Sequence, residues 1–262
     1  MDTTQRDKGT AFAALHESEP FIIPNPWDAG SARALAGLGF KALATTSSGF
    51  AFTLGRPDGG ASLADVAHHV RELVGATDLP VSVDLENGYG PEPEAAADAI
   101  RRAAEAGAVG GSIEDWDPVG RIYETAHAAE RVAAACEAAR RLDVPFLVTG
   151  RAENHIRGVD DLDDTITRLQ AYERAGADVL YAPGLGTAEE IRSVCDATTK
   201  PVNVLAHRGL TMAAIVDAGG QRVSVGGALT WVAVNAMVAA AERMRDDGDF
   251  SSLAGLTPAA RL

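Results

Sequence analysis

The sequence predicts a single (β/α)₈ TIM barrel, and three observations lead to that fold class. The chain has 262 residues, close to the roughly 250 of such barrels, and 46% of them are hydrophobic. Alanine-rich helical stretches that close on glycine alternate with short apolar strands. Several of these strands end in charged side chains, which is where a barrel of parallel strands carries its active site.

About eight strands are expected in chain order. Four of them follow a helical stretch ending in glycine, three follow a proline, and the first stands alone near the N-terminus. The predicted strands are Phe21–Ile23, Lys41–Thr45, 80–83, Ala108–Ile113, 145–148, Asp178–Ala182, 201–205 and Arg222–Val225. Helical segments lie between successive strands, which is the repeat of a parallel barrel.

No linker or low-complexity segment divides the chain, so residues 1–262 are predicted to form one domain in which only residues 1–8 and 247–262 are loose. The apolar runs are short, and the N-terminus lacks a basic region followed by an apolar one. Neither membrane insertion nor secretion is therefore expected, and the protein is expected in the cytoplasm. The net charge of −14 disfavours nucleic acid or an anionic membrane surface as a partner.

Charged side chains follow three of the predicted strands. Asp84 and Glu86 come after Val81–Val83, Glu114 after Ala108–Ile113, and Arg151 after 145–148. Because alternate residues of a strand share a face, turning Asp84 into the barrel sends the neighbouring valines outward toward the helices. The same parity turns further polar residues inward on five strands, namely Thr46, Ser48, Ser82, Glu86, Ser112, Glu114, Thr149, Arg151 and Asn203.

Three carboxylates at one barrel mouth need neutralisation. At about 4 Å each pair would repel by roughly 4 kcal/mol at an effective dielectric constant near 20. Shared protons, ion pairs with arginines of the flanking helices, or a divalent cation would each relieve this. Hard oxygen ligands without His or Cys favour Mg²⁺ or Mn²⁺ over Zn²⁺. Asp84 is the expected direct ligand, with Glu86 and Glu114 acting through water.

Six short motifs spread over about residues 21–225 are informative together, although each is weak alone. They are Pro24-Asn-Pro-Trp-Asp28, Thr45-Thr-Ser-Ser-Gly49, Gly55-Arg-Pro-Asp58, Asp84-Leu-Glu-Asn-Gly-Tyr-Gly90, Ser112-Ile-Glu-Asp115 and Gly150-Arg-Ala-Glu153. In this combination the chain resembles the isocitrate lyase and phosphoenolpyruvate mutase superfamily.

The resemblance implies a Mg²⁺-dependent enzyme that makes or breaks a C–C or P–C bond of a small 2-oxo or 2-hydroxy acid, next to an enolate of pyruvate. It also implies roles for particular residues. The implied metal ligands are Asp84, Glu86 and Glu114; the implied substrate contacts are Ser48, Gly49, Phe50, Arg151, Asn203, Val204 and Leu205; and Asp58 matches a loop aspartate that takes part in transfer or orders the site.

The chain departs from the superfamily after Glu114, where isocitrate lyases carry a lid cysteine that supplies a proton. No cysteine stands there, so a donor would have to come from Tyr123, Glu124 or His127, and classical isocitrate lyase activity is not expected. Oxaloacetate-like or phosphonopyruvate-like substrates are the first expectation. The alternatives are a phosphonomutase of the carboxyvinyl-carboxyphosphonate or phosphoenolpyruvate type, and a non-catalytic barrel that binds dicarboxylates.

The stretch from Trp231 to Met244 is apolar over most of a helix circumference, more than one barrel wall needs to cover. A partner is therefore predicted. Superfamily members commonly exchange this last helix between subunits, which implies a homotetramer built as a dimer of dimers.

Overall fold

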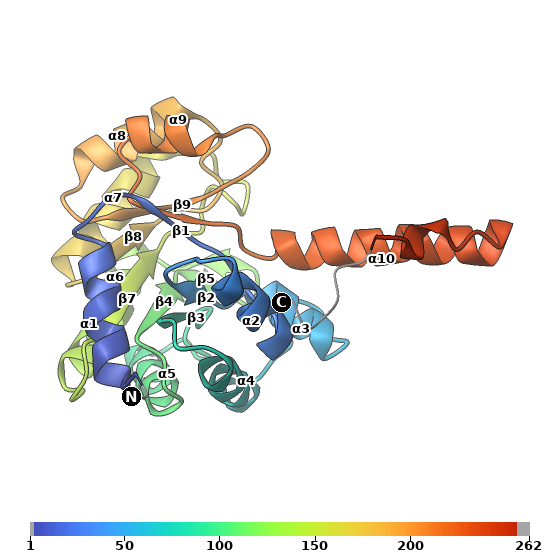
Figure 1. Ribbon diagram of the computed structural model, residues 1–262. Helices are drawn as coiled ribbons and strands as arrows, with labels where there is room; N and C mark the ends of the chain where they lie inside the picture. Colours follow the sequence, from blue (N-terminus) through green and yellow to red (C-terminus); the bar gives the residue numbers. More distant parts are fainter. Residues whose placement is uncertain (1–2, 256–262) are drawn as a thin grey trace.

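The computed structural model describes residues 3–255, and it confirms the predicted barrel (Figure 1). Eight parallel strands form one sheet in the order β1-β10-β9-β8-β7-β4-β3-β2. The Ala44 N–H donates to the Pro24 carbonyl oxygen at 3.1 Å and links the two outer strands, so the barrel is nearly closed. The strands are β1 (Phe21–Ile23), β2 (Leu43–Ala44), β3 (Val81–Asp84), β4 (Gly110–Glu114), β7 (Leu147–Arg151), β8 (Val179–Tyr181), β9 (Val202–Leu205) and β10 (Arg222–Ser224).

Helices surround the sheet, and most begin at a side chain that accepts a hydrogen bond from the first turn. Asp28, Ser62 and Thr187 each form a reciprocal capping box, which satisfies backbone donors that a helix start otherwise leaves free. The helices are α1 (Gln5–Leu15), α2 (Ala29–Gly37), α3 (Ser47–Thr53), α4 (Leu63–Ala76), α5 (Pro93–Glu105), α6 (Thr125–Arg140), α7 (Leu162–Arg174), α8 (Ala188–Ala197), α9 (Met212–Asp217) and α10 (Ala228–Asp247), followed by a 3₁₀ turn at Ser251–Leu253.

Helix α1 covers the N-terminal end of the barrel. Its Phe12 is fully buried in a cluster with Phe21 and Val109. Lys8 is also buried, and its ammonium group donates to the Thr77 carbonyl oxygen at 2.8 Å. The expectation that residues 1–8 are loose is therefore wrong for residues 5–8, because they form the first turns of α1, in which Lys8 is buried. Residues 1–2 and 256–262 of the two expected loose ends lie outside the described residues.

The strand parity expected from the sequence holds for the outward residues. Val83, Val148 and Val204 are 1%, 0% and 2% exposed and belong to the main hydrophobic cluster between the sheet and the helices. The apolar side chains of these strands therefore pack outward, which leaves the polar residues between them to fill the barrel interior.

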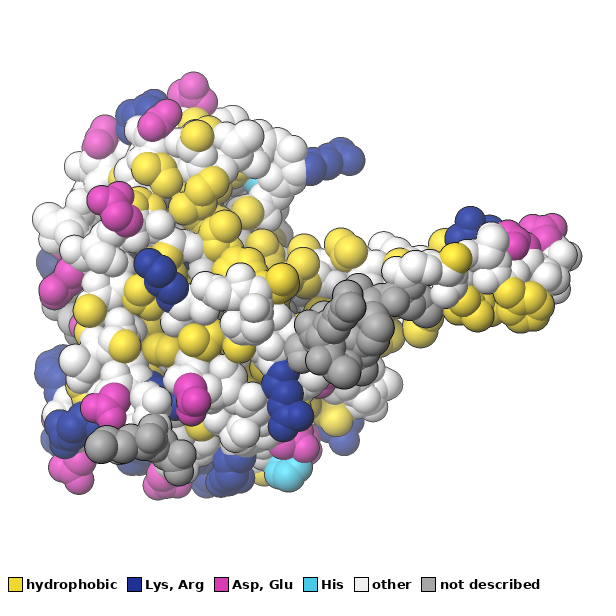
Figure 2. Space-filling view, viewed as in Figure 1, with side chains coloured by type: hydrophobic (Ala, Val, Ile, Leu, Met, Phe, Trp, Pro, Cys, Tyr) yellow, Lys and Arg dark blue, Asp and Glu magenta, His cyan; other side chains and the backbone are white. Residues whose placement is uncertain are grey.

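Helix α10 leaves the barrel and extends away from it, as Figure 1 shows. Thr230 is its one buried residue, and hydrophobic side chains such as Val232 (65% exposed) and Met237 (59%) lie open along it (Figure 2). Within residues 3–255 no helix, α10 included, has the length and apolar character needed to cross a membrane.

Candidate active site

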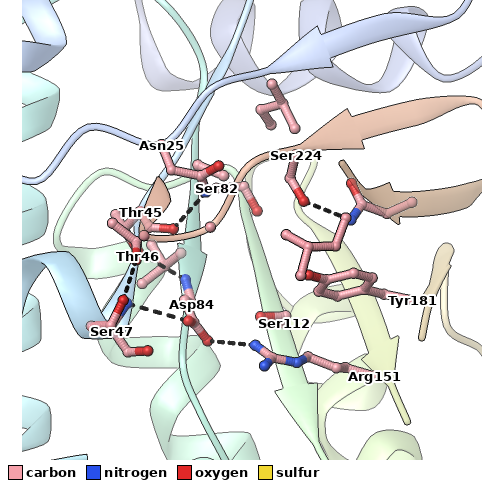
Figure 3. Close-up of a pocket in the computed structure, with 18 of the residues that line it drawn as sticks. Asn25, Thr45, Thr46, Ser47, Ser82, Asp84, Ser112, Arg151, Tyr181 and Ser224 are labelled. Carbon is pink, nitrogen blue, oxygen red and sulfur yellow. Dashed lines mark hydrogen bonds and ion pairs between the residues drawn. The ribbon is translucent and has the colours of Figure 1, made fainter. Parts of the chain in front are cut away.

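A cavity of about 190 Å³ opens at the carboxyl ends of the barrel strands (Figure 3). A second cavity adjoins it over the ends of β3 and β4, where it is lined by Glu86, Glu114 and Arg157 among others. Ser47, Asp58 and Arg151 line both. The two therefore form one mouth, a deep well with an outer, acidic side.

Arg151, the last residue of β7, connects the acids of this mouth. Its guanidinium lies 3.5 Å from Asp84 Oδ1, 3.2 Å from Glu114 Oε2 and 2.6 Å from Glu153 Oε1. The ring of Tyr181 lies beneath it, 5.2 Å from the guanidinium carbon to the ring centroid. Arg151 is thus held rigidly at the place where the sequence predicted an anion-binding arginine.

Asp84 ends β3 and points into the well (Figure 3). Its backbone N–H donates to Thr45 Oγ1 at 2.9 Å, and its Oδ2 accepts from the Ser47 N–H at 3.3 Å. Contacts to the β2–α3 segment therefore fix the carboxylate from one side while Arg151 approaches it from the other.

Glu86 lies beyond the end of β3, with a left-handed φ of 48°, so strand parity does not place it as the sequence analysis assumed. The turn still brings it to the mouth, where Tyr89 Oη donates to its Oε1 at 3.3 Å. Burial, and then the nearby charges of Asp84 and Asp58, raise the pKa of Glu86 to about 7. Asp58 itself is exposed on the loop after α3 and lines both cavities.

Glu114 ends β4 and is 6% exposed. Burial raises its pKa well above the usual value, and the facing Arg151 opposes that shift. A fully buried acid, Glu153, joins Arg151 to Arg157, whose Nη2 lies 2.9 Å from Glu153 Oε2. Arg157 also stacks on Trp116, with its guanidinium carbon 4.2 Å from the ring centroid. Glu153 was not among the site residues predicted from the sequence, although its position two residues after Arg151 repeats the spacing of Asp84 and Glu86.

The mouth fits a hard divalent cation by the chemistry of its donors. Its acids and arginines are five carboxylic acids (Asp58, Asp84, Glu86, Glu114 and Glu153) and three arginines (Arg151, Arg157 and Arg222). The acids therefore outnumber the arginines, and the nearby charges of Asp84 and Asp58 add to burial, the largest cause, in raising the pKa of Glu86. Among residues 3–255 no three His, Cys, Asp or Glu side chains are already gathered as a metal-binding group. Oxygen donors with room for water are the setting that Mg²⁺ prefers.

Comparison with known proteins decides the family. Residues 12–245 match the family described as phosphoenolpyruvate phosphomutase. The chain belongs to this phosphomutase family. The relatives and solved structures that it resembles include proteins with lyase and mutase names, and the chain is accordingly an enzyme of the phosphoenolpyruvate mutase and isocitrate lyase superfamily.

Three similar proteins show the range of this family. A candidate lyase/mutase from Burkholderia cenocepacia J2315 is 51% identical, with a TM-score of 0.94 over 97% of this chain and 93% of that one. The 2-methylisocitrate lyase of Escherichia coli (strain K12) is 31% identical over 74% of this chain and 68% of its own length. An oxaloacetate acetylhydrolase in complex with its product oxalate is 25% identical, with a TM-score of 0.88 over 99% and 94% of the two chains.

The predicted carboxylate-binding segment of this phosphomutase-family chain is only partly in the mouth. Ser48 lines the well beside Ser47. The backbone N–H groups of Gly49 and Phe50 instead donate to the side chain and carbonyl of Thr46 at 3.3 and 3.0 Å, which caps α3. Phe50 is buried. The structure therefore supports Ser48 as a candidate contact and places Gly49 and Phe50 behind it.

The predicted contacts on β9 divide by strand parity. Asn203 and Leu205 line the well, and Asn203 Nδ2 donates to Ser224 Oγ at 3.0 Å. Val204 points outward into the hydrophobic core. The expectation that all three residues contact a ligand is wrong for Val204, because successive residues of a strand face opposite ways.

The predicted proton donors lie outside both cavities. Tyr123 is 5% exposed and its Oη accepts from Asn87 Nδ2 at 3.2 Å, while Arg131 packs over its ring. Glu124 is exposed at the start of α6 and makes no side-chain cap. A short hairpin of β5 (Trp116–Asp117) and β6 (Arg121–Ile122) precedes these residues, and it is Trp116 and Pro118 of this hairpin that line the second cavity.

Proposed function

We propose that the chain is a lyase that depends on Mg²⁺ or Mn²⁺ and cleaves a C–C or P–C bond of a small 2-oxo or 2-hydroxy acid. The observation that carries the proposal is the convergence of Asp84, Glu86 and Glu114 with Arg151 above a polar well. Similarity to 2-methylisocitrate lyase and to oxaloacetate acetylhydrolase supports this substrate class.

The side chains of the mouth would have different roles in binding and catalysis. Asp84, Glu86 and Glu114 would hold the cation, which stabilises negative charge that develops on the oxygens of the bound acid. Arg151 orients the acid by charge-assisted hydrogen bonds, and its three ion pairs fix the guanidinium before any ligand arrives. Ser48 on α3 and Asn203 on β9 add neutral hydrogen bonds to the acid in the well.

Turnover followed by NMR tests the proposal. A panel of oxaloacetate, phosphonopyruvate, phosphoenolpyruvate, methylisocitrate and 2-methylmalate is incubated with and without Mg²⁺, and Asp84→Ala serves as the control. Metal-dependent product from one compound, lost in the control, supports the enzyme and identifies the bond. Rearrangement of phosphoenolpyruvate or phosphonopyruvate in place of cleavage would favour a phosphonomutase. Mg²⁺-dependent binding without product from any compound would favour the non-catalytic binder.

We further propose that α10 packs on a second copy of the chain in a homotetramer built as a dimer of dimers. The helix carries Trp231, Val232, Met237 and Val238 at 43%, 65%, 59% and 44% exposure, an apolar surface that monomers rarely leave open. Light scattering at micromolar concentration tests this. Four chains per particle are expected, and Met237→Asp should shift the particle toward smaller species. A wild-type monomer would refute the assembly.

A further inference from the structure

Arg222 is a buried cation for which the fold supplies no anion. It begins β10, is 5% exposed, and among residues 3–255 no carboxylate forms an ion pair with it. Its partners are neutral: Nε donates to Asn203 Oδ1 at 2.8 Å, Nη2 to Thr149 Oγ1 at 3.0 Å, and Nη1 lies 3.3 Å from His16 Nε2. Charges buried in proteins are as a rule paired, so this arrangement calls for an explanation.

His16 cannot supply the missing charge. Its Nδ1 lies 2.8 Å from the Phe12 carbonyl oxygen and therefore carries the proton, which leaves Nε2 as an acceptor for Arg222. Burial, and then the charge of Arg222, lower the pKa of His16 to about 4, so the ring is neutral near pH 7. Burial lowers the pKa of Arg222 to about 10, and the guanidinium stays charged.

Arg222 also has N–H donors that no contact in the barrel uses. A guanidinium has five N–H groups, and the three contacts above occupy one on each nitrogen, so two remain. Arg222 is the first residue of β10 and therefore lies on the N-terminal side of the well, its floor, and the hydroxyl-bearing Ser82, Ser112 and Ser224, which Figure 3 labels, line the same well. Arg151 at the rim differs, because three carboxylates already contact it. Of the two arginines in the well, Arg222 is the one without a counter-ion.

We propose that Arg222 forms an anion subsite on the floor of the well and binds a second acid group of the substrate. The inference rests on the proposed function and narrows its substrate class to diacids. One acid group lies at the cation and Arg151, and the other extends down the well toward Arg222.

The depth of the well gives an approximate substrate length. Thr149, which contacts Arg222, precedes Arg151 by two residues on β7, a separation of roughly 7 Å along the strand. A chain of about four carbons spans roughly 4 Å from end to end, with C–C bonds near 1.5 Å. The hydrogen bond to the guanidinium adds about 2.8 Å. A diacid of four or five carbons therefore fits.

Calorimetry with matched acid pairs tests the subsite. Malate and 2-hydroxybutyrate, like 2-oxoglutarate and 2-oxopentanoate, differ only in the distal acid group, and oxalate is too short to reach the floor. With Mg²⁺ present, the wild type should prefer the diacid at least tenfold in one pair. Arg222→Gln should lose that preference and bind oxalate within twofold of the wild type. The matched control, Arg101→Gln on the exposed face of α5, should change neither. An unchanged diacid preference in Arg222→Gln overturns the inference.

A second measurement needs only the wild-type protein, in case Arg222→Gln does not fold. Inorganic phosphate should compete for the floor, weakening the binding of the preferred diacid severalfold and leaving oxalate binding unchanged. Phosphate that weakens neither ligand, or both equally, refutes the subsite. Phosphate binding to the wild type without any diacid preference would also refute the substrate assignment and indicate a site for a free anion. Failure of the proposed function gives a different result, since oxalate would then not bind with Mg²⁺ at all.

Discussion

The pH dependence of Mg²⁺ binding follows directly from the position of Glu86. The pKa of its carboxyl is about 7 in the absence of a cation, because the group is buried near Asp84 and Asp58. A cation binds the ionised form, so binding must release the proton. Near pH 8 about nine tenths of Glu86 is ionised and near pH 6 about one tenth, which lowers the Mg²⁺ affinity roughly tenfold, or ~1.4 kcal/mol, between these values.

The comparison variant is Glu86→Gln, measured by calorimetry at pH 6, 7 and 8. The variant should bind Mg²⁺ more weakly than the wild type at pH 8. Its Mg²⁺ affinity should also change about tenfold less between pH 6 and pH 8 than that of the wild type. Glu114 also has a raised pKa and adds its own dependence to both proteins, so the difference between the two isolates Glu86. Equal pH dependence in wild type and variant would refute the assignment of Glu86 to the cation site.

The same shift predicts an effect on stability without metal. Because the pKa of Glu86 lies above its ordinary value of 4.5, the contribution of Glu86 to stability is fully present below pH 4.5 and is lost as the pH rises through about 7. The difference of about 2.5 pKa units corresponds to roughly 3 kcal/mol. Glu86→Gln should therefore raise the free energy of unfolding at pH 8 by up to about this amount in urea titrations. A destabilised variant would contradict the electrostatic reasoning.

Three further substitutions test separate parts of the structure. Arg151→Gln should reduce turnover at least a hundredfold and abolish oxalate binding in calorimetry, because the guanidinium at the rim is the proposed anion-binding group. Retained oxalate affinity would contradict this role. Tyr123→Phe should leave turnover within twofold and cost about 1 kcal/mol in urea unfolding, since its hydroxyl contacts Asn87 outside the cavities; a large loss of turnover would restore Tyr123 as a proton donor. Arg131→Met should cost about 3 kcal/mol, because the buried guanidinium donates to the carbonyl oxygens of Asn87, Gly90 and Glu114; a neutral result would show that water can replace it.

The barrel was predictable because its signal is local and repeated. Glycine-ended helices before apolar strands recur along the chain, and the parity of Val83, Val148 and Val204 follows from the strand period alone. The same period placed Asp84, Glu114 and Arg151 at one mouth, where the structure brings them together.

The errors came from local geometry that period alone does not encode. Glu86 is held by a left-handed turn, and the amides of Gly49 and Phe50 are taken by the cap at Thr46. The position of Tyr123 outside the cavities depends on contacts with Asn87 and with Arg168 on α7, whose Nη1 donates to the Tyr123 carbonyl oxygen at 2.7 Å. No sequence pattern indicated these long-range contacts.

The most direct test of the proposed active site is a crystal structure of the protein grown with Mn²⁺ and oxalate, with the metal located by its anomalous scattering. One strong Mn²⁺ peak is expected among Asp84, Glu86 and Glu114, with oxalate on the metal and within hydrogen-bond distance of Arg151 or Ser48. A peak elsewhere, or oxalate bound away from Arg151, would contradict the proposed active site.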